Sequence, residues 1–149
     1  MGTPAPASGG RRDDRILPET RITALSGFYD TDPVGPVAQR NFLNAVARLE
    51  TCLPPRRLLD ELQRIETAVF RRRREVQGGP RTMDLDILFY GNLVLNETDL
   101  IIPHPRLHER RFVLVPLAEI VPGFVHPLLR QSMAELLASL TSGERVTPI

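Results

Sequence analysis

Residues 54–90 have the sequence PPRRLLDELQRIETAVFRRRREVQGGPRTMDLDILFY, which contains the two strongest structural patterns of the chain. In residues 54–70, aliphatic residues recur every three or four positions and Pro55 suits a first helical turn, so the pattern predicts an amphipathic helix. In residues 84–90, apolar and polar residues alternate, which predicts a strand with one buried face. A helix and a strand outside any regular alternation favour the α+β class.

Segments before this helix predict further strands. Residues 21–29 are rich in β-prone types. Residues 41–50 fit either a helix or a strand, and the two prolines that follow within a few residues favour a strand. Residues 30–36, DTDPVGP, predict a loop because proline and glycine interrupt regular structure.

Segments after the predicted strand at residues 84–90 indicate shorter elements. A glycine-asparagine pair predicts a tight turn into a short strand at residues 93–95. Residues 110–120 are expected to be partly helical around a proline. The last helix should begin at Ser132, because a glutamate three residues later completes a capping box.

The composition is typical of one globular domain, with 149 residues, 42% hydrophobic and 25% charged. Residues 1–15, rich in small residues followed by charges, predict a disordered tail ahead of a domain at 16–149. No apolar run approaches the roughly 20 residues of a membrane span. The net charge of +1 argues against a general nucleic-acid binder. Cys52 is the single cysteine, which excludes an internal disulfide and favours a reducing compartment, so we expect a cytoplasmic protein.

The sequence contains no lysine, so all 19 residues in the lysine-plus-arginine total are arginines. This composition excludes Schiff-base chemistry and a Walker A phosphate loop, both of which need lysine. If the chain binds phosphate, arginine must supply the positive charge. Its planar guanidinium group can bind two phosphate oxygens at once.

Asp84 and Asp86 are the strongest candidates for chemistry. Residues two apart on a strand share a face, with Cα atoms about 6.5–7 Å apart, and two such carboxylates can hold Mg²⁺ ions. A lone pair of this kind is more often a solvated strand face. Here the opposite face is apolar and arginines at 71–74 and 81 lie close in sequence, which favours metal-assisted phosphoryl transfer.

Other candidates are ordinary when taken alone. His104 lies between two prolines and fits a loop histidine, whereas Phe42 and Phe112 fit core positions. The remaining two histidines are expected to be structural. Arginines at 71–74 also fit a helix C-terminus, where cations complement the helix dipole.

Four strings together resemble a known family. They are SGFYDTDPVGP at residues 26–36, NFLNAVARLET at 41–51, GPRTMDLDILFYGN at 79–92 and LIIPHPRLHERRFVLVPLAEI at 100–120. In this order they are similar to 6-hydroxymethyl-7,8-dihydropterin pyrophosphokinase of folate biosynthesis, and the resemblance extends from about residue 16 to about residue 140.

The resemblance implies a ferredoxin-like α+β sandwich, in which helices cover an antiparallel sheet. It also implies transfer of pyrophosphate from ATP to 6-hydroxymethyl-7,8-dihydropterin with release of AMP, and two Mg²⁺ ions as cofactors. The implied metal and phosphate ligands are Asp84 and Asp86 for the ions, Arg71, Arg73 and Arg81 at the loop that closes over the phosphates, and His104 and Arg110 for the triphosphate. The implied pterin site consists of Phe42 and Phe112 around the ring, with Asn44 and backbone groups of Thr31 and Val34 at its polar edge.

The chain departs from the family pattern at two places. Where the family has an apolar strand ending in Gly-Ser-Asn and then a helix, this sequence has only MGTPAPASGGRRDD. Either the sequence is a shortened reading of a longer chain, or a partner chain, self-association or this unusual N-terminus is expected to supply the first strand. Gly78 also replaces the loop tryptophan of the family, which suggests weaker closure of the site.

Two alternatives to an active enzyme follow from the residues. A non-catalytic relative with a structural or regulatory role fits the short N-terminus. An RNA-binding ferredoxin-like module could use the arginines at 71–74, but the near-neutral charge and the lack of a basic-aromatic sheet motif disfavour it.

Overall fold

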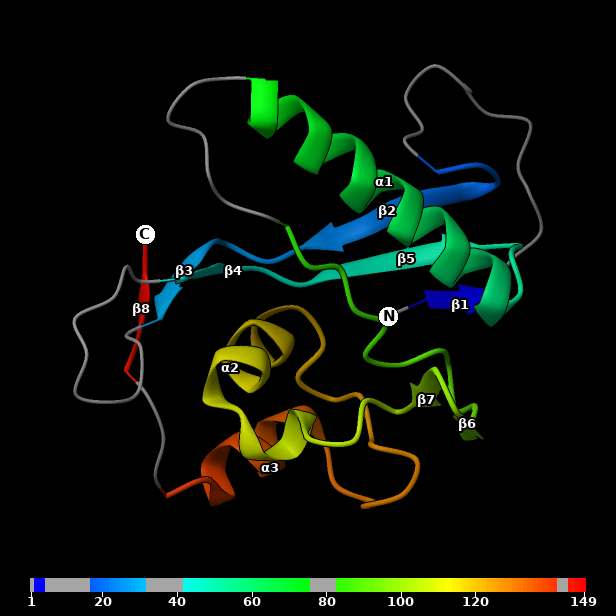
Figure 1. Cartoon of the computed structure of the whole chain (residues 1–149). Coiled ribbons are helices and arrows are strands. Elements are labelled where there is room, and N and C mark those ends of the chain that lie inside the picture. Colours follow the sequence, from blue (N-terminus) through cyan, green and yellow to red (C-terminus); the bar gives the residue numbers. More distant parts are fainter. Residues whose placement is uncertain (1, 5–16, 32–41, 76–82, 142–144) are drawn as a thin grey trace.

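The computed structural model describes residues 2–4, 17–31, 42–75, 83–141 and 145–149, and it gives side chains for these except at 2–4, 42 and 70–75. It has mixed α/β architecture, with strands between α1 on one side and α2 and α3 on the other (Figure 1). The strands are β1 Gly2–Pro4, β2 Thr20–Leu25, β3 Tyr29–Thr31, β4 Phe42–Asn44, β5 Ala47–Thr51, β6 Leu95–Glu97, β7 Leu100–Ile102 and β8 Val146–Pro148. The helices are α1 Pro55–Glu75, α2 Arg111–Ile120 and α3 Met133–Ser139, with a short 3-10 helix at Leu107–Glu109.

Among the described strands, three sheets form, with the orders β1-β5-β2, β4-β3-β8 and β6-β7. All their pairings are antiparallel except β1–β5, which is parallel. The expected antiparallel sheet is therefore confirmed for most pairs. Gly2–Pro4 form β1 and pair with β5 on the side opposite β2.

Residues 20–31 and residues 42–51 form a two-stranded antiparallel ribbon, and this ribbon contributes to two of the sheets. Its first part is β2 with β5 and its second part is β3 with β4. Between the parts, the Ser26 N–H donates to the Val46 carbonyl at 2.9 Å, and the Val46 N–H donates to the Ser26 hydroxyl at 2.8 Å. A side-chain oxygen thus replaces a backbone acceptor, which interrupts the regular ladder. The strands predicted at residues 21–29 and 41–50 are confirmed, each divided at this junction.

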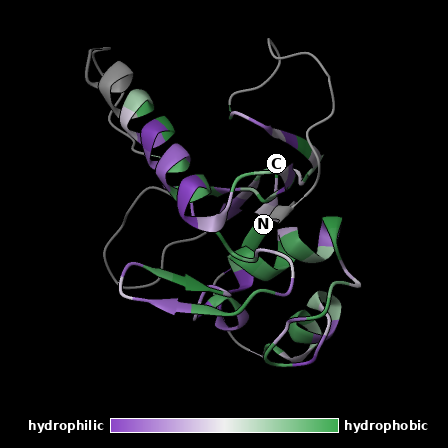
Figure 2. Cartoon of the chain, turned by 90° about the vertical axis from the view of Figure 1, so that its right-hand side faces the viewer, coloured by the Kyte–Doolittle hydropathy of each residue, from purple (hydrophilic) through white to green (hydrophobic). Residues whose placement is uncertain are grey.

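The predicted helix at residues 54–70 is confirmed as α1, which continues to Glu75. Its Leu58 and Leu62 pack with Leu49 of β5 in the first hydrophobic core. Figure 2 shows that most of α1 is hydrophilic and that α2 and α3 are more hydrophobic. Within the described residues, no helix has the length and hydrophobicity needed to cross a membrane.

The second core joins α2 and α3. Phe89, Leu114 and Met133 are fully buried there, and the Phe89 ring contacts Phe124 edge-on at 4.8 Å between centroids. The capping box predicted at Ser132 is confirmed, since its hydroxyl accepts from the Glu135 N–H and the Glu135 carboxylate accepts from the Ser132 N–H. The helix predicted around Pro116 is confirmed as α2.

Two sequence predictions near residue 90 need correction. Residues 83–89 form no strand, although their burial alternates as predicted: Asp84 and Asp86 are exposed, and Ile87 and Phe89 are buried. A period-two pattern reports burial of one face, whereas a strand also needs a partner for its backbone. The short strand predicted at residues 93–95 begins two residues later, because the turn at Gly91 leads first into two residues outside any strand.

Candidate functional site

The structure describes most of the predicted site residues, at least in their backbone. Arg71 and Arg73 lie in the last turns of α1 and Phe42 lies in β4, and for these three only the backbone is described. Arg81 and Val34 lie outside the described residues. The residues whose side chains can be placed are Thr31, Asn44, Asp84, Asp86, His104, Arg110 and Phe112.

Contacts from two other elements hold the segment that carries Asp84 and Asp86. The Leu85 N–H, between the two aspartates, donates to the Glu66 carboxylate of α1. Three residues further on, the Leu88 carbonyl accepts from the His104 N–H at 2.9 Å. These two bonds satisfy the Leu85 N–H and the Leu88 carbonyl, which in a strand would bond to a neighbouring strand. Both aspartate carboxylates remain exposed on its other face.

His104 lies within electrostatic range of both Asp86 and Arg110. Burial lowers the pKa of His104 below its ordinary value, the Asp86 carboxylate opposes this shift, and the Arg110 guanidinium adds to it. The imidazole is therefore neutral near pH 7. Its Nδ1 accepts from the Arg106 N–H at 3.4 Å, which leaves the ring proton on Nε2 as a hydrogen-bond donor.

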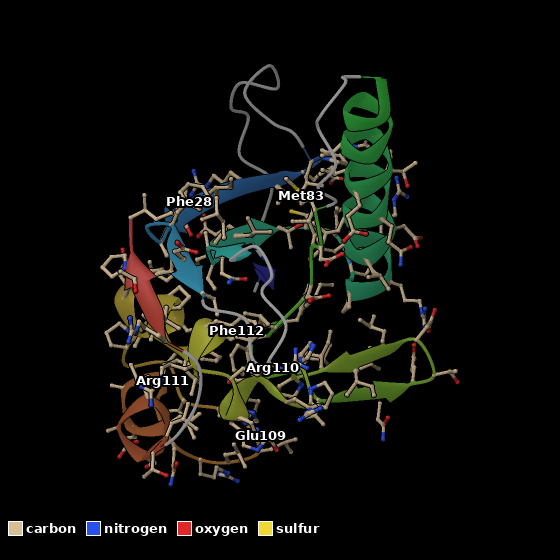
Figure 3. The ribbon with its side chains drawn as sticks, turned by 60° about the vertical axis from the view of Figure 1, so that its left-hand side comes forward. Phe28, Met83, Glu109, Arg110, Arg111 and Phe112 are labelled. Carbon is tan, nitrogen blue, oxygen red and sulfur yellow. The ribbon has the colours of Figure 1, made fainter. Side chains whose placement is uncertain are left out.

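Arg110 and Phe112 occupy the start of α2. The Arg110 guanidinium lies over the Phe112 ring, 5.8 Å from the ring centroid, which is the range of a cation–π contact. In Figure 3 both residues lie near the centre of the view, whereas Arg111 lies beside α3. This agrees with the bond from the Arg111 guanidinium to the Leu140 carbonyl at 3.1 Å. Arg110 and Arg111 are therefore adjacent in sequence but contact different parts of the molecule.

Thr31 and Asn44 lie together on neighbouring strands. Thr31 is buried, and its hydroxyl accepts from the Asn44 side-chain amide at 2.7 Å. Tyr29 is paired opposite Asn44 in the ladder and lies two residues before Thr31, so these three side chains share one face of the β3–β4 pair.

Two further residues contact this arrangement and were not predicted from the sequence. Glu66 binds the Leu85 N–H, and Glu119 of α2 binds both the Gly27 N–H and the Tyr29 hydroxyl. The hydrogen bond that the Tyr29 hydroxyl donates to Glu119, together with burial and the Glu119 charge, raises the pKa of Tyr29. Glutamate on an amphipathic helix normally indicates only a solvated face, so no local signal distinguishes Glu66 or Glu119 from their neighbours.

The comparison with known proteins adds evidence of a different kind. The sequence matches the family model for 7,8-dihydro-6-hydroxymethylpterin-pyrophosphokinase over residues 12–122. The chain belongs to this family. Members of the family include curated relatives named 2-amino-4-hydroxy-6-hydroxymethyldihydropteridine pyrophosphokinase. The one from Haemophilus influenzae is 49% identical over 111 residues, which are 74% of this chain and 69% of the relative.

Two further relatives of the same name give similar values. The Pseudomonas aeruginosa protein is 47% identical over 123 residues, which are 83% of this chain and 75% of the relative. The Bacillus subtilis protein is 50% identical over 99 residues, which are 66% of this chain and 59% of the relative. The family match therefore spans β2 to α2, which includes every described residue of the predicted site.

Asp84 and Asp86 fit the coordination habits of Mg²⁺. Within the described ranges, no group of three or more acidic, histidine or cysteine side chains forms a complete metal cage. Mg²⁺ rarely uses such a cage, since it takes one or two carboxylates and completes its shell with phosphate oxygens and water. An exposed carboxylate pair, one member of which lies near His104, suits this kind of shared site.

Proposed function

We propose that this chain transfers the pyrophosphoryl group of ATP to 6-hydroxymethyl-7,8-dihydropterin and releases AMP, a reaction of folate biosynthesis. The pterin hydroxyl oxygen would form a bond to the β-phosphorus, the bond from that phosphorus to the oxygen on the α-phosphate would break, and the hydroxyl proton would leave. The observation that carries the proposal is that the His104 N–H binds the Leu88 carbonyl, two residues after Asp86, and that Asp86 and Arg110 both act on the His104 ring, in a member of this family.

Asp84 and Asp86 are proposed to hold two Mg²⁺ ions, which would neutralise the phosphate charge when bound. The fixed backbone of the Asp84–Asp86 segment supports this role, because preorganised ligands need not rearrange when the ions and ATP bind. Their exposure is also consistent with a shared site, since phosphate oxygens and water must reach the metals.

The proposed triphosphate ligands are cationic or donate hydrogen bonds. His104 would donate from Nε2 to a phosphate oxygen, and Arg110 would contribute a permanent positive charge. Arg71, Arg73 and Arg81 are proposed to bind the phosphates from the end of α1 and the segment that follows it. In-line transfer of this kind depends mainly on positioning and charge stabilisation.

The pterin is proposed to bind between the start of α2 and the β3–β4 pair. Phe42 and Phe112 would stack on its ring in an offset geometry. Asn44, with backbone groups of Thr31 and Val34, would pair with its polar edge. The bond from Asn44 to Thr31 supports this role, because it uses one amide hydrogen and fixes the direction of the other hydrogen and of the amide oxygen.

We further propose that residues 16–149 form the pyrophosphokinase domain with a ferredoxin-like topology. The antiparallel pairings of β2 with β5 and of β3 with β4 and β8 support the antiparallel sheet that this topology requires.

The test is an incubation with ATP, Mg²⁺ and 6-hydroxymethyl-7,8-dihydropterin, followed by quantification of AMP. We expect AMP formation that requires both the pterin and Mg²⁺. Nucleotide binding without pterin-dependent AMP would contradict the proposal and favour a non-catalytic relative. Tight RNA binding with no affinity for ATP would favour the RNA-binding alternative.

A further inference from the structure

Glu119 makes contacts that neither the metal site nor the phosphate site uses. Both of its carboxylate oxygens accept from the Gly27 N–H at 3.1 Å, and Oε1 also accepts from the Tyr29 hydroxyl at 2.6 Å. One side chain of α2 therefore binds a backbone group between β2 and β3 and a side chain of β3 itself. Charged hydrogen bonds of this type are stronger than neutral ones.

These contacts connect the two proposed walls of the pterin site. Phe112 and Glu119 are seven residues apart on α2, so two helical turns place them on the same face of the helix. On the opposite wall, Tyr29 shares a face of the β3–β4 pair with Thr31 and Asn44. The bond from Tyr29 to Glu119 thus shows that the α2 face bearing Phe112 is turned toward the strand face bearing Thr31 and Asn44.

The distance between these walls matters for a flat aromatic ligand. The ligand would stack on aromatic rings and form hydrogen bonds at its edge. Both interactions weaken when the interacting atoms move apart by about 0.5–1 Å. The Ser26–Val46 bonds fix the strands to each other, but they do not reach α2. The Glu119 carboxylate provides a polar link from α2 to β3 and to the residues before it.

We propose that Glu119 is a positioning residue that fixes the gap between α2 and the β3–β4 pair and so determines how tightly the pterin ring is held. The inference rests on the proposed function, because the pterin is the ligand concerned. The described Glu119 contacts are to Gly27 and Tyr29, which places its role on the pterin side of the site.

Steady-state kinetics on three variants test this role. In Glu119→Ala we expect the KM for the pterin to rise on the order of tenfold, as one charged hydrogen-bond acceptor is lost, while the KM for ATP stays unchanged. Glu119→Gln should fall between wild type and Glu119→Ala, because its amide oxygen still accepts one bond. Tyr29→Phe removes a single hydroxyl and should raise the pterin KM by less than Glu119→Ala does.

Glu135→Ala is the matched control, since it weakens α3 through its capping box and touches neither wall. An unchanged pterin KM in Glu119→Ala, or an equal rise in Glu135→Ala, would overturn the inference and leave the proposed function intact. If Glu119→Ala does not fold, an unchanged pterin KM in Tyr29→Phe overturns it. Absence of pterin-dependent AMP with the wild-type protein would instead overturn the proposed function, and the inference with it.

Discussion

Asp84 and Asp86 are exposed because the residues that alternate with them are drawn into the interior. Ile87 is buried in the first core and Leu85 is half-buried against it. Because these apolar side chains are buried, the alternating carboxylates point toward solvent. The sequence pattern was sufficient to predict this orientation, since alternation depends only on extended backbone and one apolar face.

Replacement of Asp86 by asparagine should remove activity and preserve the fold. The carboxylate charge that a Mg²⁺ ion needs would be lost, so we expect turnover to fall by at least about a hundredfold. The side chain is exposed, so the free energy of unfolding should stay the same. Pterin-dependent AMP formation and urea unfolding measure the two effects. The exposed Asp60 on α1 provides the control Asp60→Asn, and comparable loss of activity in both variants would contradict the metal role.

His126 should titrate below the ordinary range for histidine. Burial lowers its pKa, and the nearby charge of His108 lowers it further. Its Nδ1 accepts from the N–H groups of Leu128 and Leu129, both at 3.1 Å, and protonation would remove this acceptor. Because the folded state binds the proton less readily than the unfolded state, the free energy of unfolding should fall as pH drops below about 6.5 and stay level above it.

An NMR titration of the His126 ring protons checks the pKa directly, and urea unfolding at a series of pH values checks the slope. His104 contributes a slope of the same sign, because its pKa is also lowered. The slope should therefore decrease, but persist, in His126→Asn. A titration midpoint for His126 above 6.5 would contradict the burial argument.

At the scale of secondary structure, local signals were sufficient where an element carries its own stabilising contacts. The helix α1 and the capping box of α3 depend on residues close in sequence, and both were predicted. The strand expected at residues 84–90 was wrong because strand formation depends on a partner elsewhere in the chain. Here Glu66 and His104 bond to backbone groups of this segment. Nothing near those two residues in sequence indicates such a pairing.

Loss of the α3 cap should destabilise the protein by a measurable amount. The Ser132 hydroxyl accepts from the Glu135 N–H at 3.1 Å, so Ser132→Ala leaves a helix N-terminal donor without its acceptor. We expect a decrease of about 1 kcal/mol in the free energy of unfolding, measured with urea. Ser139→Ala is the control: its hydroxyl donates to the Glu135 carbonyl within the same helix, and removing such a bond costs little. Equal effects of the two substitutions would argue against the cap.

At the scale of the whole molecule, the candidate site is assembled from distant parts of the chain. Asn44 comes from β4, Asp86 from the segment after α1, and Arg110 from the start of α2. Composition and spacing alone indicated only the aspartate pair and the arginines. The grouping of His104 with them, and the roles of Phe42 and Phe112, came from the family resemblance, because convergence in space leaves no periodic pattern in the sequence.

Ligand binding should stabilise the whole chain through this assembled site. A ligand that binds only the folded state adds about 2.7 kcal/mol at a concentration 100 times its Kd. With ATP and Mg²⁺ together we therefore expect Tm to rise by several degrees, and by less with ATP alone. In Asp86→Asn the additional effect of Mg²⁺ should disappear. Thermal unfolding followed by circular dichroism provides the measurement, and an unchanged Mg²⁺ increment in the variant would contradict the assignment of the metal ligands.

The junction at Ser26 has a consequence for how the molecule unfolds. Val46 belongs to the second core and Leu49, three residues later on the same strand segment, belongs to the first. The buried Ser26 hydroxyl holds the ribbon at the point where it passes from one core to the other. The two cores should therefore melt as a single cooperative unit, with equal calorimetric and van't Hoff enthalpies. In Ser26→Ala the buried Val46 N–H would lose its acceptor, and the transition should broaden as each core begins to melt on its own.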